Sequence, residues 1–84
     1  MLKIFFFASV REQLNCAALD LELLDHELDL AGLQERLCRE QGKHWRAVLE
    51  QDNMIRAVNQ VVVPDNCPLR DGDEVAFYPP VTGG

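Results

Sequence analysis

The sequence predicts an α+β domain in which a mixed sheet of four to five strands packs on one main helix. Runs of alternating apolar and polar residues, typical of half-buried strands, lie near both ends of the chain. Between them, from Asp29, the leucine spacing changes to the three and four residues of an amphipathic helix. At 84 residues the chain can bury one modest core, so we expect one domain and a partner that supplies part of any site.

Two antiparallel strands are predicted to open the fold. Residues 1–10 (MLKIFFFASV) are rich in aromatic and β-branched side chains and predict the first strand. Residues 18–25 (ALDLELLD) alternate again, and residues 11–16 (REQLNC) predict the hairpin loop between the two strands. The side chains expected on the core face of the first strand are Leu2, Ile4, Phe6, Ala8 and Val10.

The main helix is predicted from Asp29, as N-cap, to a stop at Gly42, with Leu30, Leu33 and Leu37 on its buried face. Residues 45–51 (WRAVLEQ) predict a short second helix with its first residue, a tryptophan, and Leu49 turned inward.

The last third of the chain predicts further strands. Residues 54–63 (MIRAVNQVVV) indicate one or two, with a tight hairpin about Asn59 and Gln60, because asparagine tolerates the left-handed conformation of such turns. After a turn-rich segment, residues 74–78 (EVAFY) predict the final strand.

The composition limits the kinds of partner that we expect for this chain. The net charge is −6, and the six arginines and two lysines are scattered, so we expect no nucleic acid and favour a basic protein face. The N-terminus lacks a signal-peptide pattern and no apolar run reaches membrane-spanning length, so we expect a cytoplasmic chain with no membrane partner.

The three cysteines predict free thiols. Cys16, Cys38 and Cys67 are odd in number and far apart, which argues against a disulfide framework and a zinc site. Cys38 belongs near the apolar face of the main helix. If one thiol carries sulfur, Cys16 and Cys67, in turn-like surroundings, are the candidates.

The chain end predicts an extended arm. Pro79 and Pro80 cannot donate to a strand ladder, so the sheet should stop near Tyr78. We expect a domain over residues 1–80 and a flexible tail over residues 81–84, which reaches about 13 Å at about 3.3 Å per residue. The glycines keep the tip narrow, and the terminal carboxyl, with an ordinary pKa near 3.5, is an anion at neutral pH.

An exposed aromatic cluster is predicted at the root of this arm. If the first and last strands are neighbours, alternation leaves Phe5, Phe7, Ala76 and Tyr78 together on the open face of the sheet. Such a cluster is either a docking site or an aggregation hazard.

Three motifs carry a family resemblance: FFASVRE at residues 6–12, AVNQ at residues 57–60 and DGDEVAFYPPVTGG at residues 71–84. Together they resemble the small, sulfur-carrying subunits of molybdopterin synthase, which are ubiquitin-like β-grasp proteins. Between about residues 16 and 52 only the pattern agrees. The resemblance covers most of the chain, and one departure is Tyr78, where phenylalanine is common.

The resemblance implies that Gly84 is adenylated and then converted to a thiocarboxylate, which donates sulfur to a pyranopterin precursor. It implies three partners: the large synthase subunit, an adenylyltransferase related to ubiquitin-activating enzymes, and a sulfur-donor enzyme. ATP is used by the activating partner, and no cofactor or metal is expected on this chain. Partner-binding residues are then the patch with Phe7 and Tyr78, together with Pro79, Pro80, Val81, Thr82 and the thin Gly83.

Other functions stay open at this point. A sulfur carrier for another pathway, such as thiamine thiazole synthesis, also ends in Gly-Gly, and a protein-conjugating modifier would deliver the same activated carboxylate to a lysine. A non-covalent interaction domain would have an incidental tail. A free-standing enzyme is disfavoured, because His26 and His44 lie in charged segments without a nucleophile placed for a triad and no phosphate-binding glycine motif occurs.

Overall fold

The computed structural model describes residues 1–24, 29–52 and 54–79. The chain contains three helices and five strands in these ranges, and none of these helices is both long and apolar enough to cross a membrane. The elements are β1 (Leu2–Phe6), α1 (Ala8–Leu14), β2 (Ala18–Leu21), α2 (Leu30–Gln41), α3 (Lys43–Leu49), β3 (Ile55–Val58), β4 (Val61–Val62) and β5 (Glu74–Tyr78).

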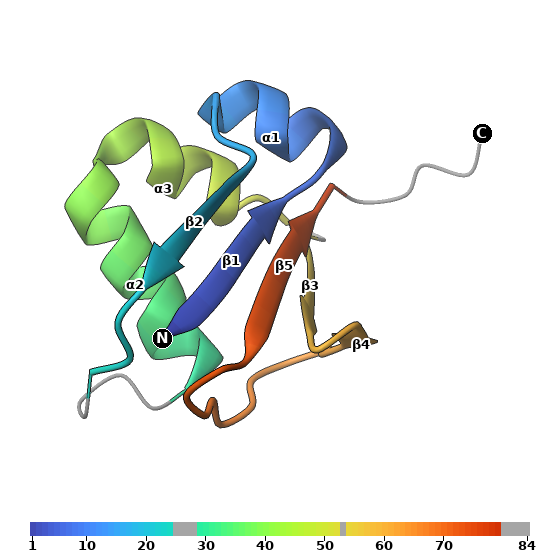
Figure 1. Ribbon diagram of the computed structural model, residues 1–84. Coiled ribbons are helices and arrows are strands. Elements are labelled where there is room, and N and C mark those ends of the chain that lie inside the picture. Colours follow the sequence, from blue (N-terminus) through green and yellow to red (C-terminus); the bar gives the residue numbers. More distant parts are fainter. Residues whose placement is uncertain (25–28, 53, 80–84) are drawn as a thin grey trace.

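The strands form one mixed sheet in the order β2-β1-β5-β3-β4 (Figure 1). The first and last strands, β1 and β5, run parallel at its centre, with Ile4 beside Val75 and Phe6 beside Phe77. The other neighbours are antiparallel. The α+β class and the pairing of the first and last strands are therefore confirmed.

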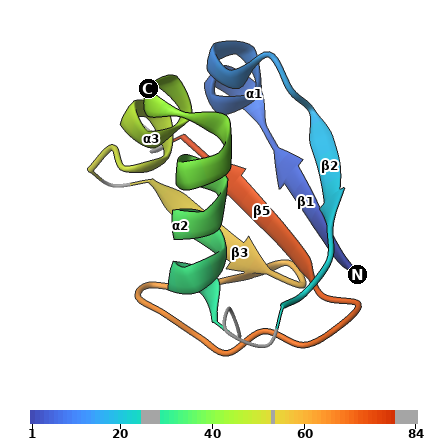
Figure 2. The ribbon, with the colours of Figure 1, turned by 90° about the vertical axis from the view of Figure 1, so that its left-hand side faces the viewer.

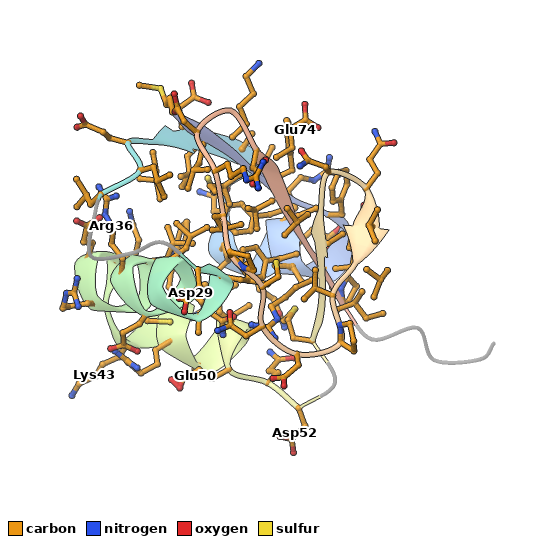
Figure 3. The ribbon with its side chains drawn as sticks, turned by 90° about the horizontal axis from the view of Figure 1, so that it is seen from below. Asp29, Arg36, Lys43, Glu50, Asp52 and Glu74 are labelled. Atoms are coloured by element: carbon orange, nitrogen blue, oxygen red, sulfur yellow. The ribbon has the colours of Figure 1, made fainter. Side chains whose placement is uncertain are left out.

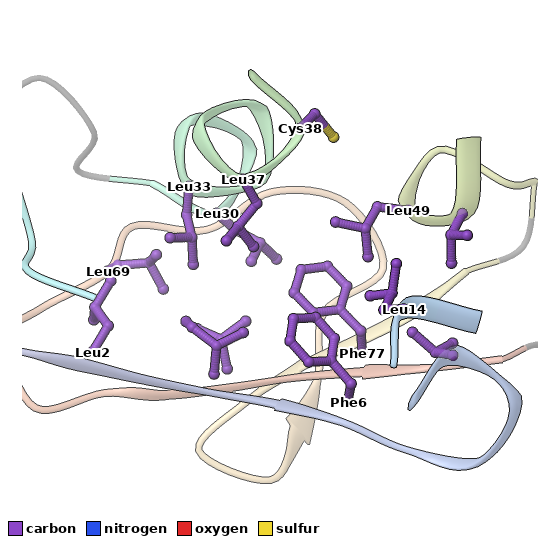
Figure 4. Packing of buried hydrophobic residues seen from close by; sticks show 14 residues of the cluster. Leu2, Phe6, Leu14, Leu30, Leu33, Leu37, Cys38, Leu49, Leu69 and Phe77 are labelled. Atoms are coloured by element: carbon purple, nitrogen blue, oxygen red, sulfur yellow. The ribbon is translucent and has the colours of Figure 1, made fainter. Parts of the chain in front are cut away.

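The helices cover one face of this sheet (Figure 2). Their buried side chains meet the core faces of β1 and β5, where alternate residues are fully enclosed (Figure 4). Because these strands are parallel neighbours, their inward residues form one continuous apolar layer under α2. The largest fully buried side chains are Leu2, Ile4, Phe6, Val10, Leu30, Leu33, Leu37, Leu49, Val75 and Phe77.

Helix α2 has the caps that the sequence predicts. The Asp29 carboxylate accepts a hydrogen bond from the Gly32 amide at 2.7 Å, which satisfies one of the free N–H groups of the first turn. Gly42, at φ +100°, ends the helix. The short helix α3 follows at once, from Lys43 rather than from Trp45. Leu49 is buried, and Trp45 is half-buried with its ring edge-on to Phe6 at 5.3 Å.

The predicted antiparallel pairing of the first two strands is confirmed, with Ile4 opposite Leu19, but the predicted connection between them is wrong. Strand β1 ends at Phe6, and residues 8–14, expected to belong to the strand and its loop, form α1. The chain leaves the sheet at Ala8, which has φ +51° and an exposed side chain instead of the core position expected for it. Val10 is buried as expected, but it packs from the helix together with Leu14, one turn later. Asn15, at φ +53°, ends α1 in the left-handed region.

The second predicted hairpin is confirmed. Strands β3 and β4 pair antiparallel about Asn59 and Gln60, which have φ values of +51° and +69°. Two successive positive φ values are typical of the tight turn whose twist matches that of the flanking strands. This hairpin forms the edge of the sheet beyond β5.

Candidate functional site

The side of the sheet opposite α2 carries the aromatic side chains that the sequence places there. The parallel register sets Phe5 beside Ala76 on this open face, with Tyr78 two residues further along β5. Phe7, just past β1, continues the pairing through its amide, which donates to the Phe77 carbonyl at 3.1 Å. We call Phe5, Phe7, Ala76 and Tyr78 the aromatic patch.

Three rings of this patch are stacked. The ring centroids of Phe5 and Phe7 lie 6.3 Å apart, with the planes inclined by 28°. Those of Phe7 and Tyr78 lie 4.8 Å apart and are nearly parallel, at 7°. Phe7 is nevertheless 39% exposed, so much of its apolar surface remains in contact with water. The patch is a preformed apolar platform.

An open apolar groove of about 410 Å³ continues the platform on the far side of Tyr78. Its floor is set by strand register, since Ile55 lies opposite Tyr78 and Ala57 lies opposite Ala76. The sequence analysis did not find these positions, although aligning residues 55–58 against the final strand would have placed them on the open face. The lining residues are Ala8, Ile55, Ala57, Gln60, Val62, Tyr78 and Pro79.

The outer wall of the groove is fixed by hydrogen bonds from the β3–β4 turn. The Asn59 side-chain amide donates to the Asp73 carboxylate at 2.9 Å, and its carbonyl accepts from the Glu74 amide at 3.0 Å. The Asn59 backbone amide donates to the Glu74 carbonyl at 2.7 Å. These three bonds fasten the turn to the start of β5, and Val62, which follows the turn in β4, lines the groove.

The root of the predicted arm adjoins both features. Strand β5 ends at Tyr78, as expected from the prolines, and Pro79 is half-buried in the groove wall. The other arm residues named by the sequence analysis, Pro80, Val81, Thr82, Gly83 and Gly84, lie outside the described residues.

Helices α2 and α3 are linked by an ion-pair cluster centred on Arg46. The Arg46 guanidinium of α3 lies 2.8 Å from the Glu35 carboxylate of α2 and 3.1 Å from that of Glu50. The Arg46 hydrogen bond holds the pKa of Glu35 below its usual value, and both carboxylates raise the pKa of Arg46. Figure 3 shows Lys43 and Glu50 on this side of the molecule and Glu74 on the opposite side of the sheet.

Among the described residues, the three thiols and His44 lie in separate surroundings. Cys38 is buried, and burial raises the pKa of its thiol, whereas Cys16 and Cys67 are half-buried. All three are free. The exposed His44 ring contacts the Gln13 carbonyl at 2.5 Å, and His26 lies outside the described residues. Across residues 1–24, 29–52 and 54–79, no three His, Cys, Asp or Glu side chains gather as metal ligands.

Comparison with a solved structure confirms the ubiquitin-like β-grasp fold. The chain superposes on a subunit in the "Protein-protein complex of subunit 1 and 2 of Molybdopterin-converting factor" from Helicobacter pylori with a TM-score of 0.67. The sequences are 24% identical, over 99% of this chain and 97% of that one.

Sequence relatives extend over the whole chain. The molybdopterin synthase sulfur carrier subunit of Escherichia coli K12 is 42% identical over 84 residues, and that of Haemophilus influenzae is 38% identical over the same length. Each alignment covers 100% of both chains. The family model described as the ThiS family matches residues 4–84, from within β1 to the last glycine. On both kinds of match, this chain belongs to the ThiS family.

Proposed function

We propose that this chain is the sulfur carrier subunit of a molybdopterin synthase and that its C-terminal Gly84 is the group that carries the sulfur. The observation that carries the proposal is the end-to-end similarity to two proteins named as such subunits. The aromatic patch supports it, because an exposed ring stack at the root of the Gly-Gly arm is suited to a protein whose end enters a partner.

The arm supplies the reacting group. Its terminal carboxylate is ionised at neutral pH, so an oxygen can attack the α-phosphorus of ATP and release pyrophosphate without a base from this chain. Hydrosulfide delivered by a donor enzyme then attacks the carbonyl carbon of the acyl-adenylate, AMP leaves, and loss of the sulfur-bound proton to solvent gives a thiocarboxylate. This chain binds no cofactor in the proposed scheme, and the ATP site belongs to the adenylyltransferase partner.

The platform offsets the cost of ordering the arm. Fixing residues 80–84 in a partner costs about 1–2 kcal/mol per residue in backbone entropy. Burial of the apolar surface of the aromatic patch and groove against the large subunit offsets this entropic cost. The large subunit supplies the catalytic side chains for sulfur transfer to the pyranopterin precursor. The Helicobacter pylori neighbour is itself a complex of two subunits, which supports a large-subunit partner here.

The test is intact mass spectrometry after incubation with ATP, the activating enzyme and a sulfur source. We expect one exchange of oxygen for sulfur, localised to Gly84 by fragmentation. An unmodified chain, with the enzyme shown to be active on a known carrier, would contradict carrier chemistry and favour a non-covalent binding domain. A lysine adduct on a second protein would favour a modifier.

A second step assigns the pathway. The thiocarboxylate form is mixed with the large synthase subunit and the pyranopterin precursor, and the dithiolene product is measured together with regeneration of the carboxylate. Sulfur transfer to a thiazole precursor and not to the pterin would favour the thiamine alternative.

A further inference from the structure

Tyr78 belongs to both apolar features of the open face. Its ring stacks on Phe7 of the aromatic patch, with the centroids 4.8 Å apart, and it also lines the groove together with Ile55. Strand order puts these two neighbours on opposite sides of Tyr78, because β5 lies between β1 and β3 (Figure 1). A partner surface that covers both the aromatic patch and the groove therefore also covers Tyr78.

The Tyr78 hydroxyl is the polar end of this side chain, and it makes no hydrogen bond with any described residue. A tyrosine hydroxyl donates one hydrogen bond and can accept others. Ile55 and Ala57, the groove residues nearest in register, offer no polar side-chain atom. Gln60, which also lines the groove, lies in the β3–β4 turn, beyond the end of β3 that is farther from Tyr78. In the free protein the hydroxyl therefore depends on water.

Docking of a partner on this surface removes water from the hydroxyl. A buried donor without a partner costs more free energy than one ordinary hydrogen bond contributes to stability. Most buried tyrosine hydroxyls accordingly have a hydrogen-bond partner. An entirely apolar partner surface would therefore bind here with a penalty that a surface carrying one acceptor oxygen avoids.

The acceptor that fits this place is uncharged. A carboxylate buried among apolar side chains is costly unless a cation pairs with it. Lys3, the cation that the register of β1 and β5 places on the open face, lies beside Glu74. It is four residues before Phe7, about 13 Å away at about 3.3 Å per residue, and is too distant to pair with a carboxylate beside Tyr78. A carbonyl oxygen accepts the hydrogen bond without this cost.

We propose that the large synthase subunit places a carbonyl oxygen, from its backbone or from an Asn or Gln side chain, against the Tyr78 hydroxyl. The proposal rests on the proposed function and adds the chemistry of the partner surface. That surface is apolar over Phe7 and over Ile55, and it carries one uncharged acceptor between them. The hydroxyl thereby selects against apolar surfaces that lack the acceptor.

The test compares Tyr78→Phe with the wild type by isothermal titration calorimetry against the large subunit. We expect the Kd to rise about 10-fold, because the hydrogen bond is lost and the partner's carbonyl is left unpaired. The ratio of the two Kd values should be the same at about 0.1 M and about 1 M salt, where the Debye lengths are about 10 and 3 Å. Unchanged or tighter binding of Tyr78→Phe would overturn the inference, and a ratio that falls at high salt would overturn the uncharged acceptor.

A second variant at the same position separates the hydrogen bond from the shape of the ring. Tyr78→p-aminophenylalanine keeps a donor in place of the hydroxyl, and we expect it to recover most of the affinity that Tyr78→Phe loses. Equal losses in the two variants would overturn the inference.

Substitution of the large subunit identifies the source of the carbonyl. Each Asn and Gln of that subunit is replaced by Ala, and the Kd ratio between Tyr78→Phe and the wild type is measured again. A substitution that removes the difference identifies an amide side chain as the acceptor. A ratio that persists in every variant identifies a backbone carbonyl.

Controls separate this inference from the proposed function. Thermal unfolding of both Tyr78 variants should match the wild type, because the stacked ring is kept and the hydroxyl makes no bond to a described residue. If the wild-type chain does not bind the large subunit, the proposed function fails and this inference fails with it. If the wild type binds and transfers sulfur but Tyr78→Phe binds equally well, only the acceptor opposite Tyr78 is wrong.

Discussion

Phe7 and Tyr78 stack with their ring centroids 4.8 Å apart and their planes 7° from parallel, although they lie near opposite ends of the sequence. The contact depends on the parallel pairing of β1 with β5, which brings the C-terminal ends of both strands to the same edge of the open face. The exposed residue that follows β1 is thereby in contact with the last residue of β5, which directly precedes the prolines. The aromatic patch and the end of β5 are therefore in direct contact through one ring pair.

The first prediction concerns this ring pair. Phe7→Ala should weaken binding to the large subunit by about 1–3 kcal/mol, because truncating an aromatic anchor removes buried apolar contact in the complex. Isothermal titration calorimetry measures the change. Val61→Ala is the matched control, since Val61 is also exposed but alternation turns it away from the open face that carries Val62. Equal losses in the two variants would show that the patch is not the docking site.

The second prediction concerns the terminal carboxylate. Adding one alanine after Gly84 should abolish thiocarboxylate formation and sulfur transfer, because the reacting group is displaced and carries a Cβ that widens the tip. The midpoint of thermal unfolding should not change, since the core ends with β5. Both quantities are measured on the same preparation. Sulfur transfer by the extended chain would remove the case for the terminal carboxylate.

The third prediction concerns the corner at Ala8. Its φ of +51° is unfavourable for a residue with a Cβ. Ala8→Val should lower the free energy of unfolding by about 1–3 kcal/mol, because a β-branched residue tolerates this region poorly. Ala8→Gly should be neutral or stabilising by up to about 1 kcal/mol, as the removed strain offsets the greater entropy of the unfolded chain. Urea denaturation distinguishes these outcomes, and a glycine variant less stable than the valine variant would contradict the assigned backbone conformation.

The fourth prediction is a pH dependence. The Gly32 amide, and then the Asn66 side chain, hold the pKa of Asp29 below its ordinary value of 3.8. The carboxylate therefore stabilises the fold fully above pH 3.8, and this contribution is lost as the pH falls through 3.8 toward the lower folded-state pKa.

Asp29→Asn keeps a cap oxygen but does not titrate. It should be less stable than the wild type at pH 7, and the difference in unfolding free energy should shrink by pH 2. Urea titrations at both pH values measure it. A difference that is constant with pH would mean that Asp29 titrates alike in the folded and unfolded chains.

The fifth prediction concerns thiol reactivity. Cys38 is 2% exposed, and burial raises its pKa, so both access and thiolate fraction are low. In the native protein a thiol reagent should label Cys16 and Cys67 before Cys38, which should react at a comparable rate only in denaturant. Peptide mass spectrometry after timed quenching gives the three rates. Equal labelling of Cys38 without denaturant would contradict its burial.

Much of the fold could be predicted because local chemistry and tertiary packing agree over most of the chain. Asp29 and Gly42 mark both ends of α2 through capping groups that act within one turn. Asn59 likewise marks the β3–β4 turn through its tolerance of positive φ. The four residues of the aromatic patch followed from alternation once the two end strands were taken as neighbours.

Helix α1 could not be found by the same reasoning. Its first apolar residues, Ala8 and Val10, continue the every-second-residue pattern of β1. The helical spacing of four residues between Val10 and Leu14 is therefore not apparent from the sequence. The break between β1 and α1 is at Ala8, whose backbone is in the left-handed region. Alanine seldom adopts this conformation, and no residue type in this segment predicts it. The groove was missed for a different reason: its walls depend on the register of β3 against β5, which is a long-range property.

The central position of β5 has a consequence for synthesis. Val75 and Phe77 of this strand are buried, and they pack at the middle of the sheet between β1 and β3. During translation the earlier elements emerge first, but the central strand with which β1 and β3 pair is still missing. Because this pairing is non-local, the sheet forms only after β5 has been synthesised. A chain terminated before Tyr78 would expose the apolar face of β1, and the cell's proteases could remove it. The chain can therefore reach its native state only after translation has come within a few codons of the glycines.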